Sequence, residues 1–393
     1  MNILFLLKSF GIGGLEIVSQ TLANKFVAKG HNVVCFAFAE CESTVADRLD
    51  EKVNLYVQNS YEYNSENIAS LRQCLLENSI DVIINQWGLP YLPVKIATEA
   101  SKGLNVKIVS VHHNSPDANG MLQAAKLHRS EQHWWLGKYF YSLKYYILRL
   151  VTGLSMRYVY SKSDIYMVLS QSFVEKFKKF TFMRNPDHLI VQTNPVTVKQ
   201  PDCIVRQDKK REILYVGRLD SIQKKVSRVI DVWSLLEHQY PDWNLVIVGD
   251  GPARQELQNQ ALKLGLSRIS FEGFKSPVEY YKRASILMLT SDFEGFPLVL
   301  PECMSFGVVP VVYGSYSAVY DIIDGNNGLV SEPQFGKFSA ENMTDCVSSL
   351  MSDEQLLMKM SSAAVKTAEK YSIDTIYQSW MNILNNLVLK EGK

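Results

Sequence analysis

One segment in the C-terminal part of the chain constrains the fold more than any other. Four apolar residues, Ile286–Leu289, read as a buried strand that ends in a polar turn, Ser291–Gly295. A helical pattern follows, with Pro297 placed in its first turn, and Val308–Val312 reads as the next strand. A strand–loop–helix–strand unit of this kind builds a parallel sheet, whose ligands lie beyond the carboxyl ends of the strands. We therefore expect the turn after Leu289 to border a ligand site.

The same alternation of strand and helix continues through most of the chain and predicts an α/β protein. With 393 residues the chain is too long for one ordinary core and fits two domains. The polar, patternless stretch 197–211 is predicted to be a linker between domains 1–196 and 212–372. Strands are expected at Ile3–Leu7, Val33–Ala37, Val53–Val57, Asp81–Asn85, Val106–Val111, 163–170, 212–216, 245–248 and 269–274.

Composition narrows the class of protein further. Hydrophobic residues make up 47% and charged residues 21%, as in a globular chain, and a formal net charge of +1 argues against a simple polyanion binder. The six cysteines include no C-x-x-C pair, so we expect reduced thiols rather than a zinc site. The N-terminus lacks a signal-peptide pattern, and no run of about 18 apolar residues predicts a spanning helix. A cytoplasmic location is expected.

Two loops that follow predicted strands carry candidate ligand-binding residues. After Leu7 comes a glycine-rich turn with Gly13 and Gly14, which lets a diphosphate or a sugar approach backbone N–H groups, although a tight turn without a ligand is the alternative. Its spacing is not G-x-G-x-x-G, so a dinucleotide site and a nicotinamide oxidoreductase are disfavoured. After Val216, Arg218 and Lys224 share one loop, where they could stabilise a departing diphosphate or form a plain basic surface turn.

The sequence E-G-F-P-L from Glu294, followed by Glu302 and G-x-x-P-V-V, resembles the E-x7-E signature of retaining GT-B glycosyltransferases, family 4. The resemblance extends over nearly the whole chain. It implies two Rossmann-like domains facing a cleft, with a C-terminal helix, 373–393, that packs back on the first domain. It also implies transfer of a sugar from a nucleotide diphosphate to a hydroxyl, with retention of the anomeric configuration.

The resemblance assigns roles to individual residues. Catalytic roles fall on His113, Arg218, Lys224 and Glu294, and donor binding on Gly13, Gly14, Gly217, Gly249, Gly251, Phe274, Gly295, Phe296, Pro297, Leu298 and Glu302. Glu294 would hold sugar hydroxyls, Glu302 the ribose, and Phe274 would lie beside the base. His112 is the alternative to His113, and a structural histidine is the alternative for either. Lys225 stands where glycine is usual in the family, which leaves the assignment of Lys224 open by one position.

Residues 121–160 interrupt the alternation with aromatic and basic residues. Six cations face one acid, Glu131, in this segment, and Trp and Tyr are interleaved with them. The pattern suits a peripheral membrane face that meets a lipid-linked acceptor. An aromatic helix pair packed on the sheet is the equal alternative, and a single-strand nucleic-acid platform is a more distant one.

Other functions stay open at this level. A GT-B-fold sugar-nucleotide epimerase or a non-catalytic membrane-associated scaffold would use the same architecture. No D-x-D pair follows a predicted strand, so no cofactor and no metal are expected. The expected donor is a UDP-sugar, and the expected acceptor is a lipid-linked glycan of bacterial surface polysaccharide assembly, with a soluble acceptor as the alternative. No nucleic-acid partner is expected.

Overall fold

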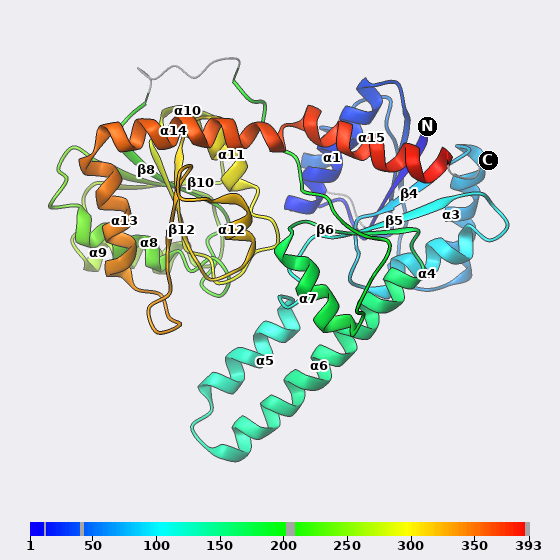
Figure 1. Ribbon diagram of the computed structural model, residues 1–393, viewed down its shortest axis with the longest axis horizontal. Coiled ribbons are helices and arrows are strands. Elements are labelled where there is room, and N and C mark those ends of the chain that lie inside the picture. Colours follow the sequence, from blue (N-terminus) through cyan, green and yellow to red (C-terminus); the bar gives the residue numbers. More distant parts are fainter. Residues whose placement is uncertain (12, 40–42, 202–208, 390–393) are drawn as a thin grey trace. The chain divides into compact units, whose positions relative to one another are not determined.

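The computed structural model describes residues 1–11, 13–39, 43–201 and 209–389 (Figure 1). The chain divides into two compact units, Met1–Thr197 with Ile373–Lys393, and Val198–Ser372. Each unit contains one parallel β-sheet with helices, so the predicted α/β class with two Rossmann-like sheets is confirmed. Part of the predicted linker, 202–208, lies outside the described residues, as do the last residues of the predicted terminal helix, 390–393.

Unit 1 is built on a sheet of order β3-β2-β1-β4-β5-β6-β7, with every neighbouring pair parallel. Its strands are β1 Asn2–Leu7, β2 Asn32–Ala37, β3 Asn54–Val57, β4 Val82–Asn85, β5 Lys107–His112, β6 Ile165–Val168 and β7 Leu189–Val191. Its helices are α1 Gly14–Ala28, α2 Ser43–Ala46, α3 Ser65–Glu77, α4 Tyr91–Ala100, α5 Gly120–Glu131, α6 Trp135–Ser161, α7 Ser172–Thr181 and α15 Ile373–Leu389. The chain reverses its winding between β1 and β4, which form the centre of the sheet.

The C-terminal helix α15 completes unit 1 although it is formed by the other end of the chain. It packs along α1, where Tyr377 Oη lies 2.9 Å from His31 Nε2 and Lys25 Nζ lies 2.6 Å from Asp374 Oδ1. Trp380 and Leu384 on this helix are buried. Helix α15 therefore supplies part of the core of unit 1.

Unit 2 has a sheet of order β10-β9-β8-β11-β12-β13, again with parallel pairs throughout. Its strands are β8 Glu212–Val216, β9 Asn244–Val248, β10 Ile269–Gly273, β11 Ile286–Leu289, β12 Val309–Tyr313 and β13 Leu329–Ser331. Its helices are α8 Ser227–Leu236, α9 Arg254–Lys263, α10 Val278–Arg283, α11 Val299–Ser305, α12 Ala318–Ile322, α13 Ala340–Ser352 and α14 Glu354–Ala368, with a 3-10 turn at Glu369–Tyr371. The central pair, β8 and β11, marks the point where the strand order reverses.

The structure corrects the sequence-based boundaries in several places. Strands β4 and β5 begin at Val82 and Lys107, one residue later than expected, and the elements α13 and β7 were not predicted. Residues in β7 are only half-buried, so their apolar signal is weak. Of the six cysteines, Cys41 and Cys203 lie outside the described residues, and three of the four described ones are buried.

Residues 121–160, which break the alternation in the sequence, form a helical hairpin of α5 and α6 (Figure 1). Only the C-terminal part of α6 has buried residues, among them Met156 and Tyr160. A helix pair is therefore present, but four aromatic residues on α6, Trp135, Tyr139, Phe140 and Tyr146, are exposed to solvent rather than packed on the sheet. Within the described part of the chain, no helix is long and apolar enough to cross a membrane.

Candidate active site

The central pair of strands in unit 2 brings two loops together at its carboxyl edge. The loop after β8 runs from Gly217 to α8, and the loop after β11 runs from Thr290 to α11. Thr290 Oγ1 donates to the carbonyl oxygens of Lys224 and Lys225, and Asp292 N donates to the Gln223 oxygen at 2.8 Å. The strand order reverses between these strands, and the carboxyl edge at such a reversal is where doubly wound sheets bind ligands.

A buried ion pair joins the two loops. Lys224 Nζ lies 2.5 Å from Glu294 Oε1, and the side chains are 20% and 9% exposed. Ser291 Oγ donates to the same carboxylate oxygen at 2.6 Å, and Gln223 Nε2 donates to the other at 3.4 Å. Three donors compensate the desolvated carboxylate, which makes the position of Glu294 well defined.

Arg218 and Lys225 share the loop with Lys224, and their positions help to assign its role. Arg218 is 61% exposed and contacts Asp220 at 3.3 Å, so its guanidinium stays at the surface of the loop. Lys225 has φ +52°, in the left-handed region that glycine adopts at little cost. The backbone at 225 thus has the conformation for which a glycine would be suited, and Lys224 is the lysine that reaches Glu294.

Glu302 lies on α11 and is also buried. Tyr281 Oη on α10 donates to Glu302 Oε2 at 3.1 Å. Burial, and then the charge of Glu302, raise the pKa of Tyr281 well above its usual value, so the phenol stays protonated and remains a donor. Arg218 and Glu302 therefore have different partners from the Lys224–Glu294 pair.

The glycines after β8 and β9 serve close backbone packing. Gly249 has φ +145° and Gly251 φ +154°, and a Cβ atom on either would collide with the backbone oxygen of Gly217 or Leu219 respectively. Leu219 N donates to the Asp250 oxygen at 2.9 Å, which holds the two loops side by side. The need for glycine here has a structural cause that is independent of any ligand.

The structure corrects one detail of the segment after Glu294. Pro297 does not lie in the first turn of a helix, because α11 begins at Val299 with Leu298 as its N-cap. The Pro297 oxygen accepts from Leu300 N at 3.0 Å, which forms a turn that leads into the helix. Phe296, which follows Gly295, is buried against Tyr371, whereas Phe274 after β10 is 73% exposed.

The predicted histidines lie in unit 1, at the carboxyl end of β5. His112 Nδ1 lies 2.8 Å from Tyr166 Oη, and His113 Nε2 lies 2.6 Å from Gln86 Oε1. Burial lowers the pKa of His112 to about 4, and burial with the neighbouring His112 lowers the pKa of His113 to about 3. If Gln86 Oε1 accepts this hydrogen bond, His113 donates from Nε2 and its Nδ1 is an acceptor.

The glycine-rich loop of unit 1 also ends at a helix N-terminus. Gly13 is the N-cap of α1, Gly14 is its first residue, and a Cβ atom at 13 would collide with the side chain of Glu16. Lys8, at the end of β1, has its Nζ 5.8 Å from the ring of Trp87, which follows β4. The central strands of unit 1 thus also place a cation and an aromatic ring at their carboxyl edge.

Sequence reasoning missed three polar residues around the glutamates of unit 2. Tyr281 and Ser291 bind Glu302 and Glu294 directly, and Tyr316 is buried close enough that the charge of Glu294 contributes to raising its pKa. Ser291 belongs to the turn Ser291–Gly295 that is expected to border a ligand site, and its hydroxyl three residues before Glu294 is a signal that the sequence contains. Tyr281 and Tyr316 come from other elements, so only the strand order brings them near.

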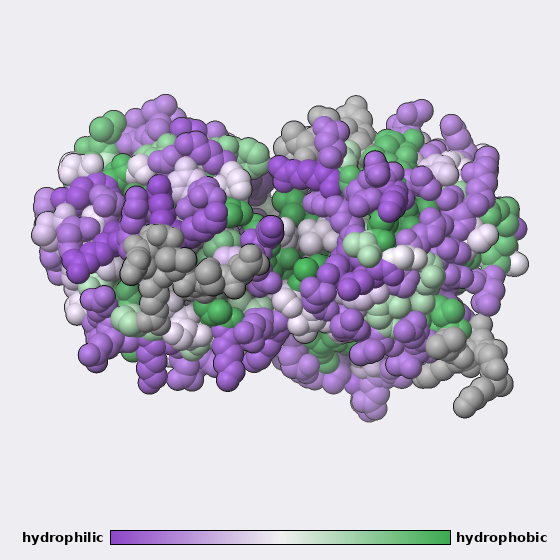
Figure 2. Space-filling model, turned by 90° about the horizontal axis from the view of Figure 1, so that it is seen from above, coloured by the Kyte–Doolittle hydropathy of each residue, from purple (hydrophilic) through white to green (hydrophobic). Residues whose placement is uncertain are grey.

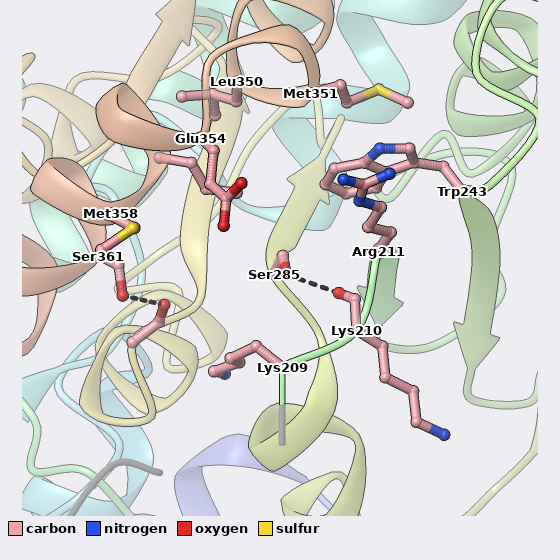
Figure 3. A pocket seen from close by; sticks show the side chains of 12 residues that line it. Lys209, Lys210, Arg211, Trp243, Ser285, Leu350, Met351, Glu354, Met358 and Ser361 are labelled. Atoms are coloured by element: carbon pink, nitrogen blue, oxygen red, sulfur yellow. Dashed lines mark hydrogen bonds between the residues drawn. The ribbon is translucent and has the colours of Figure 1, made fainter. Parts of the chain in front are cut away.

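A separate pocket of about 210 Å³ lies in unit 2 (Figure 3). Its lining includes residues that directly precede strands, such as Arg211 before β8, Trp243 before β9 and Ser285 before β11. It therefore opens at the amino edge of the sheet, opposite to the loops of Lys224 and Glu294. In the described part of the chain, no cluster of three or more His, Cys, Asp or Glu side chains could hold a metal ion.

Comparisons with known proteins identify the class. Residues 12–198 match the family Glycosyltransferase Family 4, and residues 199–367 match Glycosyl transferases group 1. Together the two matches span most of the chain, and the chain belongs to these glycosyltransferases. The predicted family and the prediction of a transferase enzyme are confirmed.

Full-length relatives have names that agree with this class. The chain is 27% identical over 97% of its length to an uncharacterized glycosyltransferase of Haemophilus influenzae, covering 98% of that protein. It is 25% identical, over 98% of each chain, to the GalNAc-alpha-(1->4)-GalNAc-alpha-(1->3)-diNAcBac-PP-undecaprenol alpha-1,4-N-acetyl-D-galactosaminyltransferase of Campylobacter jejuni. It is 26% identical to the lipopolysaccharide 1,6-galactosyltransferase of Salmonella typhimurium, over 82% of this chain and 83% of that one.

Solved structures share the fold. The lipopolysaccharide outer core galactosyltransferase WaaB in its apo form has a TM-score of 0.70 at 21% identity, with all of both chains covered. Anabaena HepE in complex with UDP has a TM-score of 0.73 at 17% identity, covering 98% of this chain and 99% of that one. The GT-B fold expected from the sequence is thus confirmed.

Proposed function

We propose that the protein transfers a sugar from a UDP-sugar to a hydroxyl of a lipid-linked glycan, with retention of the anomeric configuration, in bacterial surface polysaccharide assembly. The observation that carries this proposal is the Lys224–Glu294 pair at the central strands of unit 2. The names of relatives support the acceptor class, since one acts on an undecaprenol-linked glycan and another is a lipopolysaccharide galactosyltransferase. The same fold is solved with UDP, which supports UDP-sugars as the donors to test first.

The residues of unit 2 suit the departure of a diphosphate. Lys224 offers a compact positive charge whose position is set by Glu294, and exposed Arg218 can reach a phosphate with its planar fork. Glu294 accepts from Lys224, Ser291 and Gln223 and can bind a sugar hydroxyl beside them. Glu302, fixed by Tyr281, would accept hydrogen bonds from the ribose, and Phe274 would lie near the base.

Roles in donor binding are also proposed for backbone segments of unit 2 and, separately, for three residues of unit 1. The backbone at Gly217, Gly249 and Gly251 would lie along the nucleotide, as would the segment from Gly295 to Leu298. From unit 1, Gly13 and Gly14 would present backbone N–H groups to the donor, and His113 would accept from a sugar hydroxyl through Nδ1. This assignment rests on the resemblance and on the tautomer that the Gln86 contact implies.

Thermal-shift and hydrolysis measurements with a panel of UDP-, GDP- and ADP-sugars test the donor. We expect one UDP-sugar to raise the melting temperature and to be hydrolysed slowly. With an acceptor glycan added, nuclear magnetic resonance of the glycosylated product should show the anomeric configuration of the donor. Stabilisation by GDP- or ADP-sugars alone would contradict the base, and an inverted product would contradict retention. Isomerisation of the donor without an acceptor would point to an epimerase instead.

The transfer is proposed to need no metal ion, because cationic side chains can neutralise the leaving diphosphate. We expect activity to persist in excess EDTA. Loss of activity in EDTA and its return with manganese would contradict this part of the proposal.

A further inference from the structure

The hairpin of α5 and α6 has an apolar face that no described part of unit 1 covers. Ten apolar and aromatic side chains on α6 share exposed fractions between 43% and 73%. They are Trp135, Leu136, Tyr139, Phe140, Leu143, Tyr146, Ile147, Leu150, Val151 and Leu154. Their spacing of one and three residues places them along a single side of the helix over about 30 Å, at 1.5 Å per residue. A contiguous exposed face of this size marks an interaction surface.

Contacts on the other side of α6 hold the hairpin together and fix it to unit 1, although its apolar face is exposed. Helix α5 packs along α6, and Asn119 caps α5 through Leu122 N while its amide donates to Thr152 Oγ1 at 3.1 Å. Ser155 Oγ on α6 donates to the Leu89 oxygen at 2.7 Å. The hairpin is thus anchored to the loops at the carboxyl edge of the sheet, and the apolar face is left over after that packing.

The charge around this face is concentrated and positive. Residues 120–161 contain six Lys and Arg and one acid, Glu131, which gives a formal charge of +5. Since the whole chain has +1, the remaining residues together carry −4. Arg129, Lys138 and Lys144 are exposed, whereas Arg149 is half-buried, with its guanidinium 5.1 Å from the ring of Phe180. The charge therefore favours a negatively charged partner and opposes a second copy of the same hairpin.

We infer that this face of α6 lies in the surface of an anionic lipid bilayer. The helix would lie in the plane of the interface with its apolar side chains among the acyl chains, as amphipathic helices do, and its cations would contact the headgroups. Tyr and Trp side chains suit this depth because they join an apolar ring to a polar group. The inference rests on the proposed function in one respect. The anchored base of the hairpin would then hold the carboxyl edge of unit 1, with His113, close to the surface from which a lipid-linked acceptor projects.

Flotation of the purified full-length protein with vesicles tests the inference. We expect binding to vesicles of phosphatidylglycerol and phosphatidylethanolamine and at least tenfold weaker binding to pure phosphatidylcholine. The triple variant Tyr139→Ser, Phe140→Ser, Ile147→Ser is expected to lose binding at least tenfold. The matched control replaces three exposed hydrophobic residues elsewhere, Leu76→Ser, Leu262→Ser and Phe335→Ser, and is expected to bind like the wild type.

A charge variant separates the two contributions to binding. Arg129→Glu, Lys138→Glu, Lys144→Glu is expected to reduce binding to anionic vesicles at least tenfold at low salt, while binding to phosphatidylcholine changes little. These residues are exposed, so the fold is expected to persist, and circular dichroism checks this. Equal flotation of the wild type and both triple variants would overturn the inference, as would a wild-type protein that stays in the lipid-free fraction.

Other occupants of the face give different results. A dimer in lipid-free buffer that dissociates in the Tyr139, Phe140, Ile147 variant would show that a second copy covers it, and binding of single-stranded oligonucleotides in place of vesicles would show a nucleic-acid surface. Either result would overturn the inference.

Hydrolysis of the donor sugar is measured in parallel. Flotation without hydrolysis of any donor would contradict the proposed function alone, and hydrolysis without flotation would contradict the bilayer contact alone.

Discussion

At the scale of single residues, the position of Lys224 follows from one charged contact. Its ammonium has a buried carboxylate as partner, and the neighbouring Lys225 accepts a left-handed backbone so that Lys224 can turn toward β11. The two consecutive lysines therefore differ in role although their side chains are identical. The family resemblance favoured Lys224 but left the assignment open by one position, because the distinction lies in the backbone angle at Lys225 and in the contact of Lys224 with the loop after β11.

Substitution of Lys224 should separate catalysis from stability. Lys224→Met leaves a buried carboxylate without its counter-ion, which costs about 3 kcal/mol of unfolding free energy, and should lower kcat about 10²- to 10³-fold. The double variant Lys224→Met, Glu294→Gln removes the stranded charge and should regain much of the stability but none of the activity. Urea unfolding and donor turnover measure the two effects, with Lys263→Met on α9 as the control. Recovery of activity in the double variant would contradict a catalytic role for the lysine.

The histidines of β5 should make stability depend on pH. The pKa of His112 is about 4 in the folded chain and about 6.5 when unfolded, so the unfolded state binds more protons between these values. Stability at pH above about 6.5 is therefore unaffected by this group and falls as the pH drops from 6.5 toward 4. Chemical unfolding at pH 7, 6 and 5 should show a flatter dependence in His112→Gln than in the wild type, whatever its absolute stability. His133→Gln, an exposed position, is the control, and an equally flat curve for this variant would contradict the assignment.

At the scale of elements, strands could be predicted where burial leaves a continuous apolar run. Ile286–Leu289 was predicted with its observed bounds because all four residues are buried between neighbouring strands. The short strand β7 was not predicted, because a half-buried edge strand of three residues has no such run. Helix α13 has a clear N-cap in Ser339, but it was not predicted because its polar face and the nearby loop obscure the helical pattern.

Contacts between elements were harder to predict than the elements themselves. The sequence separates Lys224 from Glu294 by seventy residues, and only the neighbouring positions of β8 and β11 in the sheet bring them together. The family resemblance assigned roles to Lys224 and Glu294, whereas it assigned none to Tyr281 and Tyr316. Physical patterns in one sequence show which segments form strands, but they do not show the order of those strands.

The packing of the loops after β8 and β9 makes a prediction at this scale. Gly249→Ala should destabilise unit 2 by about 2–4 kcal/mol, because its Cβ atom would collide with the Gly217 carbonyl and the backbone has a positive φ. Gly265→Ala has a positive φ of 68° but open space around the Cβ atom, so only about 1 kcal/mol is expected. Urea unfolding of the two variants compares steric collision with backbone strain. Equal losses would show that strain alone accounts for the requirement for glycine at 249.

At the scale of the whole molecule, the surface is uneven in character. The face drawn in Figure 2 is mostly hydrophilic, and its hydrophobic residues form small separate groups. The exposed face of α6 gathers ten hydrophobic side chains on one helix. This contrast, together with the charge of +5 around the hairpin, is what distinguishes it from ordinary surface.

The contribution of α15 to the stability of unit 1 can be tested at Trp380. This side chain is 2% exposed on α15, and Trp380→Ala should cost about 3–5 kcal/mol of unfolding free energy. Gln378→Ala, two residues earlier on the exposed side, should change stability by less than about 0.5 kcal/mol. Thermal unfolding should show the loss in a transition that a donor nucleotide does not shift, if the nucleotide binds unit 2. A loss no larger than that of the control would mean that α15 contributes little to the unit.

The position of α15 also sets the order in which the protein can form during translation. Residues 198–372 are continuous in the chain, so unit 2 has all of its sequence once residue 372 has left the ribosome. Most of unit 1 is made first but lacks α15 until residues 373–389 have been made, and the side of α1 that carries Phe26 has no contact with Tyr377 until then. A nascent chain that stalls before residue 373 would therefore hold a finished second half and an incomplete first half, and that species is the one a chaperone would have to protect.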